Sequence, residues 1–320
     1  MKKVIIAIIV LLIVGVGAYF LYDNFQRSAQ EEESTDEVLN DEIEDTHEAD
    51  IEDEVDIEED LDVDEELVSV PRQGEMTIGV SAGGRDIKAY TIGEGSSSVL
   101  FVGGIHGGYS FNTSLLAYEL IDYLSNNSDD IPHNLRVTVI PVLNPDGLAM
   151  VGINEPGPFL TSDITGGNEA RVEGRFNANG VDLNRNFDCE WQTEAFWQDR
   201  GVNAGTSPFS EPEAKSIENF VNQFSPVAVV AWYAASGEVF PASCGSTLPS
   251  NATISLMNAY ADSTPYTKSD TFEYYPITGD MMDWLAGQGI PSISVLLSDR
   301  ESIEWENNVD GIKSVLNHLR

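Results

Sequence analysis

Three polar segments of this chain combine side chains that can bind a metal ion or a carboxylate. Residues 103–109 contain His106 among glycines, residues 144–147 read Asn-Pro-Asp-Gly, and residues 175–187 contain one aspartate and two arginines. Imidazole nitrogens ligate zinc, and the planar guanidinium group of arginine makes charge-assisted, often bidentate, contacts to carboxylates. The sequence therefore indicates a site for metal chemistry, for carboxylate recognition, or for both.

The first two segments each follow an apolar run that is typical of a buried β-strand. Such runs alternate with stretches of helical spacing, which predicts an α/β fold with a mixed, mostly parallel sheet and helices on both faces. We expect a helix at residues 114–124 and strands at residues 98–102, 135–142, 227–232 and 290–297. In such sheets the ligand site lies at the carboxyl ends of the strands, so the fold should bring the polar segments together.

The order and spacing of these segments resemble the M14 zinc carboxypeptidase family. Two further segments, residues 207–213 and 275–284, extend the likeness from about residue 78 to the C-terminus. The resemblance implies a zinc ion held by two histidines and a glutamate, with an open position for water. It also implies a glutamate as general base, and arginines that bind the substrate's terminal carboxylate and the developing oxyanion.

Most of that family's zinc site is missing from this sequence. His106 matches the first histidine ligand, and Asp182 matches the carboxylate that orients it. The positions of the glutamate ligand, the second histidine and the general base carry other side chains, which are Tyr109 or Ser110, Tyr233 and Leu296. No cofactor is therefore expected, and zinc is expected only if the site is active after all.

The half of the family pattern that recognises substrate is retained. Asn184 and Arg185 match the pair that binds the C-terminal carboxylate, Arg175 matches the arginine that stabilises the oxyanion, and Tyr275 matches the mobile tyrosine that covers the substrate. Met282 matches a position that often tunes the side-chain pocket, and its apolar thioether suggests no demand for a basic side chain. The resemblance thus implies a pocket that binds free peptide C-termini.

These matches also have structural alternatives. Arg185 could pair internally with Asp182, Tyr275 could pack near Trp284, and His106 could be a hydrogen-bonded structural residue. In the opposite direction, a weak metal site rich in carboxylates could be formed by residues close to the matched positions, which are Glu238, Asp280 and Asp299.

The N-terminal region predicts a membrane anchor. Residues 4–22 are apolar and long enough, at the rise of a helix, to cross a bilayer. A cleaved signal peptide is the alternative, with Gly17-Ala18 as a weak cleavage site. Lysines before this segment and acidic residues after it place residues 1–3 in the cytoplasm and the rest of the chain outside, as a single-pass membrane protein.

An acidic segment follows the predicted anchor. Residues 31–66 contain 22 Asp and Glu residues but no Lys, Arg, aromatic, Pro or Gly, which predicts that residues 23–67 form an extended, disordered stalk. Folding against a partner and weak Ca²⁺ binding are alternatives. The net charge of −38 argues against nucleic acid as a partner, because phosphate binding requires clustered Lys and Arg.

Residues 68–320 are predicted to form one domain of the M14 type. This domain contains both cysteines, Cys189 and Cys244. An outward-facing domain allows them to pair, and we expect a disulfide between them; spacing alone does not exclude two separate buried thiols.

Three functions are compatible with these features. The leading hypothesis is a catalytically degenerate carboxypeptidase-like module that recognises peptide C-termini outside the membrane, including cell-wall peptides if the source is bacterial. The second is an active zinc metallocarboxypeptidase that hydrolyses peptides or peptidoglycan stem peptides. The third is a scaffold or interaction domain that does not use its pocket. Metal analysis of the purified protein separates the first two.

Overall fold

The computed structural model describes residues 74–155, 157–245 and 247–320. The predicted cytoplasmic end at residues 1–3, anchor at residues 4–22 and stalk at residues 23–67 lie outside the described residues. Among the helices that are described, none combines the length and the apolar character needed to cross a bilayer.

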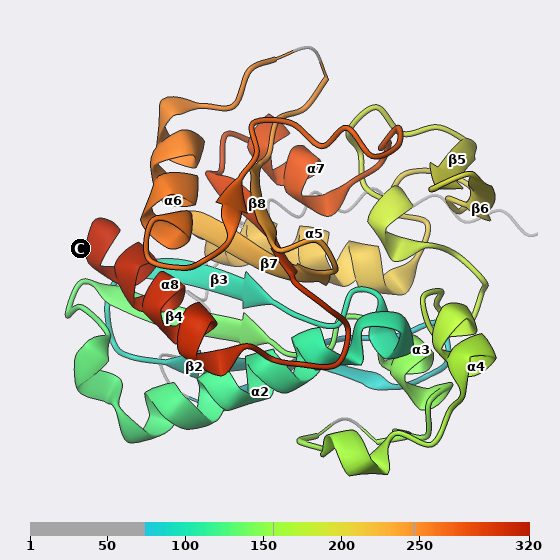
Figure 1. Cartoon of the computed structure of the whole chain (residues 1–320), viewed down its shortest axis with the longest axis horizontal. Helices are drawn as coiled ribbons and strands as arrows, with labels where there is room; N and C mark the ends of the chain where they lie inside the picture. The colour runs from blue at the N-terminus through green and yellow to red at the C-terminus, as the bar shows by residue number, and fades with distance from the viewer. Residues whose placement is uncertain (1–73, 156, 246) are drawn as a thin grey trace, which may run out of the picture. The chain divides into compact units, whose positions relative to one another are not determined.

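A mixed eight-stranded sheet forms the centre of the described domain (Figure 1). Its spatial order is β1-β2-β4-β3-β7-β10-β8-β9. The strands are β1 (Gly74–Val80), β2 (Asp86–Ile92), β3 (Ser97–Val102), β4 (Leu135–Ile140), β7 (Ala228–Ala234), β8 (Glu238–Pro241), β9 (Thr267–Lys268) and β10 (Ser292–Leu297). The four central strands β4, β3, β7 and β10 are parallel, and β2 and β8 flank them in the antiparallel sense. The carboxyl ends of the central strands therefore lie at one edge of the sheet.

Helices cover both faces of the sheet, because successive side chains of each strand point to opposite sides. Val99 and Phe101 of β3 belong to the apolar core beneath α2, α6 and α8, whereas Leu100 and Val102 belong to the core beneath α5 and α7. Figure 1 shows these two groups of helices on opposite sides of the sheet. Their bounds are α2 (Phe111–Asn126), α5 (Pro212–Phe224), α6 (Asn251–Ala261), α7 (Met281–Gly287) and α8 (Trp305–His318).

Short elements connect the strands and carry several of the predicted site residues. They are η1 (Gly107–Ser110), η2 (Ser128–Asp130), α3 (Pro145–Ala149), η3 (Thr161–Asp163), α4 (Asn168–Glu173), η4 (Leu183–Arg185), β5 (Glu194–Trp197) and β6 (Arg200–Asn203). Asp182 begins η4, and its Oδ1 accepts a hydrogen bond from the backbone N of Asn184 at 3.2 Å. This cap fixes the turn that presents Asn184 and Arg185.

The structure confirms the predicted α/β fold with a mixed sheet and helices. The predicted strands at residues 98–102, 135–142, 227–232 and 290–297 overlap β3, β4, β7 and β10, and the predicted helix at residues 114–124 lies within α2. These central strands were predictable because they are buried on both faces and therefore form continuous apolar runs.

Candidate functional site

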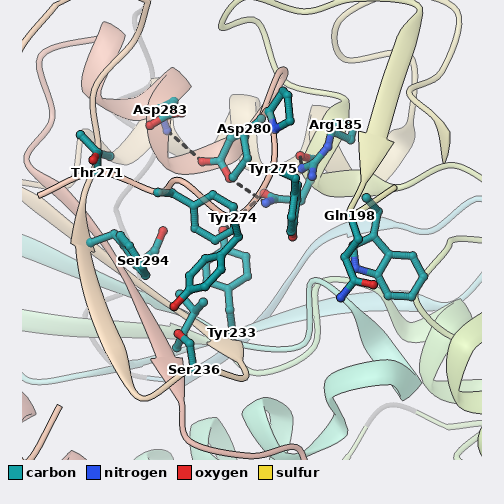
Figure 2. Close-up of a pocket in the computed structure, with 18 of the residues that line it drawn as sticks. Arg185, Gln198, Tyr233, Ser236, Thr271, Tyr274, Tyr275, Asp280, Asp283 and Ser294 are labelled. Carbon is teal, nitrogen blue, oxygen red and sulfur yellow. Dashed lines mark hydrogen bonds between the residues drawn. The ribbon is translucent and has the colours of Figure 1, made fainter. Parts of the chain in front are cut away.

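A cavity of about 1080 Å³ opens at the carboxyl ends of the central strands (Figure 2). His106 follows β3, Tyr233 lies near the end of β7 and Leu296 near the end of β10, and all three line this cavity. Arg185 of η4 and a loop that includes Tyr275 complete much of its wall. The cavity is therefore located where the strand pattern predicted it.

His106 is buried in the cavity wall and has no hydrogen-bond partner among the described residues. Its Nε2 lies 3.7 Å from Oδ1 of Asp182, which is too far for a hydrogen bond, and neither ring nitrogen is paired. Burial and the positive charge of Arg175 lower the pKa of His106 to about 4. The imidazole is therefore neutral at neutral pH.

Asp182 pairs with Arg175. The Nε of Arg175 donates a hydrogen bond to Oδ2 of Asp182 at 2.8 Å, and Nη2 lies 2.8 Å from the same oxygen. Burial alone would raise the pKa of Asp182, but the charges of Arg175 and Arg185 and the neighbouring His106 together outweigh burial and hold this pKa well below the usual range. The alternative that Arg185 pairs with Asp182 is therefore wrong, because the arginine that reaches this carboxylate is Arg175.

Arg185 instead bonds to backbone carbonyls and keeps one nitrogen free. Its side chain is only 1% exposed, its Nε donates to the carbonyl of Phe196 at 3.0 Å, and its Nη1 donates to the carbonyl of Asn184 at 2.6 Å. The buried Nη2 has no partner among the described residues. Arg185 lines the cavity, so this guanidinium has an unused donor and, within residues 74–155, 157–245 and 247–320, no neutralising ion pair.

Asn184 is held between two elements beside Arg185. Its Nδ2 donates to Oδ2 of Asp280 at 2.6 Å, and its Oδ1 accepts from the hydroxyl of Tyr233 and from the backbone N of Met281, each at 3.3 Å. Asn184 is therefore rigidly positioned at the cavity wall, with both ends of its amide already engaged.

Tyr275 lies over Arg185 and does not join the cluster around Trp284. Its ring centroid is 5.8 Å from the Arg185 guanidinium carbon and 4.9 Å from the ring of Phe272. Trp284 packs instead against Phe187 and Phe209. The alternative that Tyr275 packs near Trp284 is therefore wrong. Figure 2 shows Tyr275 and Arg185 together at the cavity.

The residues that the sequence predicts at the remaining ligand and general-base positions differ in where they lie. Tyr109 lines the cavity, whereas Ser110 is buried away from it. Tyr233 and Leu296 occupy neighbouring parallel strands in register with each other, and both line the cavity. Burial raises the pKa of Tyr233 well above its usual value, so its hydroxyl remains protonated.

The three carboxylates considered for a rebuilt metal site are not brought together. Only Asp280 lines the cavity, and its Oδ1 caps α7 by accepting from the backbone N atoms of Met282 and Asp283. Glu238 accepts hydrogen bonds from Ser269 and Tyr274, and Asp299 caps the turn after β10. Within residues 74–155, 157–245 and 247–320, no three His, Cys, Asp or Glu side chains form a group that could hold a metal ion.

The expectation for Met282 is wrong. Met282 is fully buried in the core between α7 and the sheet and does not line the cavity. The reason is that Asp280 caps α7, and the helix that begins there turns the side chain of Met282 toward the core.

Carboxyl groups line the cavity near this helix, because Asp283 and Glu190 reach it. Burial and the neighbouring charge of Asp280 raise the pKa of Asp283 to about 8.

Sequence reasoning missed Arg300. Its guanidinium lines the cavity, lies 4.5 Å from the ring centroid of Tyr109, and donates from Nη2 to the carbonyl of Ala234 at 3.2 Å. Arg300 follows the carboxyl end of β10, which is where ligand-binding residues of such sheets gather. The position of Arg300 just after a predicted strand was the signal in the sequence that could have identified it.

Cys189 and Cys244 form a disulfide in the structure, with their Cα atoms 5.7 Å apart. Cys189 follows η4 and Cys244 follows β8, and both flank the cavity wall. The backbone of Cys189 also accepts a hydrogen bond from Gly279 at 2.8 Å. The cross-link thus joins the segment after η4 to the segment between β8 and α6, and the Gly279 hydrogen bond joins it to the segment before α7.

The family model for zinc carboxypeptidases of peptidase family M14 matches residues 71–308. Carboxypeptidase B of Astacus astacus is 24% identical over 277 residues, which cover 76% of this chain and 88% of that protein. Bacteriocin BCN5 of Clostridium perfringens is 29% identical over 159 residues, covering 48% of this chain but only 16% of that protein.

Solved structures give the same likeness at the level of the fold. Bovine thrombin-activatable fibrinolysis inhibitor, in complex with tick carboxypeptidase inhibitor, has a TM-score of 0.61 at 17% identity and covers 78% of this chain and 90% of that chain. Murein-tripeptide amidase MpaA of Escherichia coli O157 has a TM-score of 0.54 at 19% identity, and the match covers 76% of this chain and 91% of that chain. At these identities the likeness shows the fold alone.

Proposed function

Because this chain belongs to the zinc carboxypeptidase family, we propose that its domain binds the C-terminal carboxylate of peptides without cleaving them. One observation carries the proposal. The Arg185 guanidinium is buried at the cavity wall, and within the described part of the chain it has no carboxylate partner and keeps an unpaired Nη2. A buried donor without a partner costs free energy, which a bound carboxylate would recover through a charge-assisted hydrogen bond.

The side chains around His106 support peptide binding without zinc catalysis, because they offer too few metal ligands. A catalytic zinc site needs three protein ligands, and among the described residues His106 is the only imidazole that lines the cavity. Tyr109, Tyr233 and Leu296 stand at the remaining ligand and general-base positions. The guanidinium groups of Arg185 and Arg300 form no ion pair among the described residues, line the cavity and would repel a divalent cation. These side chains do not fit the family's zinc ion, and we assign no step to it.

The proposal includes the place of binding. We infer that residues 4–22 anchor the chain, that residues 23–67 space the domain from the bilayer, and that the ligands are peptides outside the membrane. The apolar run, the flanking charges and the acidic composition support this arrangement. Cell-wall peptides are one candidate class, since one structural relative is a murein-tripeptide amidase.

Matched acid and amide peptides test the proposal. Full-length protein in a non-ionic detergent is titrated calorimetrically with acetyl-Ala-Ala-Ala and with its C-terminal amide. Loss of a charge-assisted contact of about 1.5–3 kcal/mol should weaken the amide about tenfold to hundredfold. Arg185→Ala should remove the difference between the two peptides.

Arg136→Ala is the control, because Arg136 is another buried arginine that donates to a backbone carbonyl, that of Gly95, outside the cavity. This variant should keep the preference for the acid. Equal binding of acid and amide by the wild-type protein would overturn the proposal and favour a scaffold function.

A further inference from the structure

Arg300 enters the cavity as a guanidinium that is held from two sides. Its Nη2 donates to the carbonyl of Ala234 at 3.2 Å, and its carbon lies 4.5 Å from the centroid of the Tyr109 ring. Its Nε is buried and has no partner among the described residues. The contacts fix the plane of the guanidinium but leave a donor and the full positive charge available.

The neighbours of Arg300 provide no carboxylate to neutralise it. Tyr109 also lies 5.7 Å from the Arg175 guanidinium carbon and packs edge-on against Trp197, at 4.9 Å between ring centroids. Arg175 is committed to Asp182, and no ion pair joins Arg300 to a described carboxylate. This wall of the cavity is therefore cationic and aromatic.

A different wall is acidic. Asp283 accepts a hydrogen bond from the backbone N of Ser243, after β8, at 3.0 Å, and Asp280 lies beside it at the start of α7. Arg300 contacts neither residue but lies against Ala234, at the end of β7. The cavity thus offers separate surroundings to two parts of a bound ligand, one favourable to negative charge and one unfavourable.

We propose that Arg300 forms a second anion-binding subsite, so that the preferred ligands are peptides with an acidic side chain at the penultimate residue. This inference rests on the proposed function, in which the terminal carboxylate binds at Arg185. The wall at Asp280 and Asp283 disfavours a further negative charge, as the raised pKa of Asp283 indicates, and therefore disfavours an acidic side chain on the terminal residue itself. The preceding residue can place its carboxylate at Arg300, where Nε has no partner among the described residues and the Tyr109 ring holds the guanidinium in plane.

Four peptides locate the second charge. Acetyl-Ala-Glu-Ala and acetyl-Ala-Gln-Ala differ only at the penultimate residue, whereas acetyl-Ala-Ala-Glu and acetyl-Ala-Ala-Gln differ only at the terminal one. In titrations of the full-length protein, penultimate Glu should bind about tenfold more tightly than Gln, which is the low end for a charge-assisted contact because Arg300 is only half-buried. Terminal Glu should bind no better than terminal Gln.

Variants of Arg300 assign the effect to this side chain. Arg300→Gln should abolish the preference for penultimate Glu, while Arg300→Lys should keep part of it because the charge remains. Arg200→Gln is the matched control, since Arg200 is an exposed arginine over the ring of Trp197, at 5.4 Å, that does not line the cavity. Thermal unfolding and the acid-over-amide preference of each variant show whether the fold and the Arg185 subsite persist.

The outcomes separate the two proposals. Equal binding of penultimate Glu and Gln, with the acid-over-amide preference retained, overturns the Arg300 subsite alone. A preference for terminal Glu, or a penultimate preference that survives in Arg300→Gln, also overturns it. Loss of the acid-over-amide preference in the wild-type protein overturns the proposed function, and the subsite with it.

Discussion

The Arg175 guanidinium and the Asp182 carboxylate form a fully buried ion pair, with Nε and Nη2 each 2.8 Å from Oδ2. Both side chains are almost inaccessible to solvent, and Asp182 also caps η4. The pair therefore links the loop after α4 to the turn that presents Arg185. Removing one charge from such a pair leaves the other buried and uncompensated.

Asp182→Asn should for this reason lower the free energy of unfolding by about 3–5 kcal/mol, measured by urea denaturation. The control is Asp262→Asn, which removes a surface partner of Lys268 at 2.7 Å and should cost less than about 1 kcal/mol. Equal losses in the two variants would mean that solvent screens the Arg175–Asp182 pair.

Asp283 should make stability depend on pH. Its pKa in the folded protein is raised to about 8, whereas an unfolded aspartate titrates near about 4. The folded state therefore binds the extra proton between these values, and the free energy of unfolding contributed by Asp283 falls as pH rises from about 4 to about 8. Asp280 and Glu190 oppose its ionisation, and Arg185 favours it.

Asp283→Asn should accordingly gain stability relative to wild type as pH rises, with little difference at pH 4 and the largest difference above pH 8. Asparagine keeps an oxygen that can accept from the backbone N of Ser243. Thermal unfolding of both proteins from pH 4 to pH 9 measures the difference. A gain that is the same at every pH would contradict the raised pKa.

Metal content tests the absence of a catalytic zinc ion. Purified full-length protein should contain far less than one equivalent of zinc by elemental analysis, because His106 is the only imidazole among the described residues that line the cavity. His106→Ala should leave the content unchanged, as should the control His133→Ala at an exposed position. Stoichiometric zinc that is lost in His106→Ala but kept in His133→Ala would restore the active carboxypeptidase hypothesis.

The Cys189–Cys244 cross-link should stabilise the domain by about 2–4 kcal/mol, because it restricts a loop of 55 residues in the unfolded chain. Unfolding with and without a reductant measures this contribution. The double variant Cys189→Ser/Cys244→Ser should show no effect of reductant. Two thiols that react with an alkylating agent in the native protein, before reduction, would contradict the cross-link.

The sequence by itself determined the central strands and the location of the site. The strands β3, β4, β7 and β10 are apolar runs, and burial on both faces of a sheet is visible in a short stretch of sequence. The carboxyl ends of parallel strands lie at the same edge of a sheet, so His106 and Leu296 could be placed near one another from the sequence alone. The resemblance of residues 175–187 to the M14 pattern also pointed to Asn184 and Arg185 as candidate carboxylate-binding residues.

Only the tertiary structure decided how these side chains pair. The sequence left open a pair between Arg185 and Asp182, three residues apart. In the structure Asp182 pairs with Arg175, seven residues away, and the side chain of Arg185 extends toward Phe196. Met282 matched a pocket position but is turned inward by the helix that Asp280 caps. Arg300 and Tyr109 are separated by 191 residues and meet only because β3 and β10 both flank β7. Such contacts depend on side-chain directions fixed by the packed fold, which spacing along the chain does not specify.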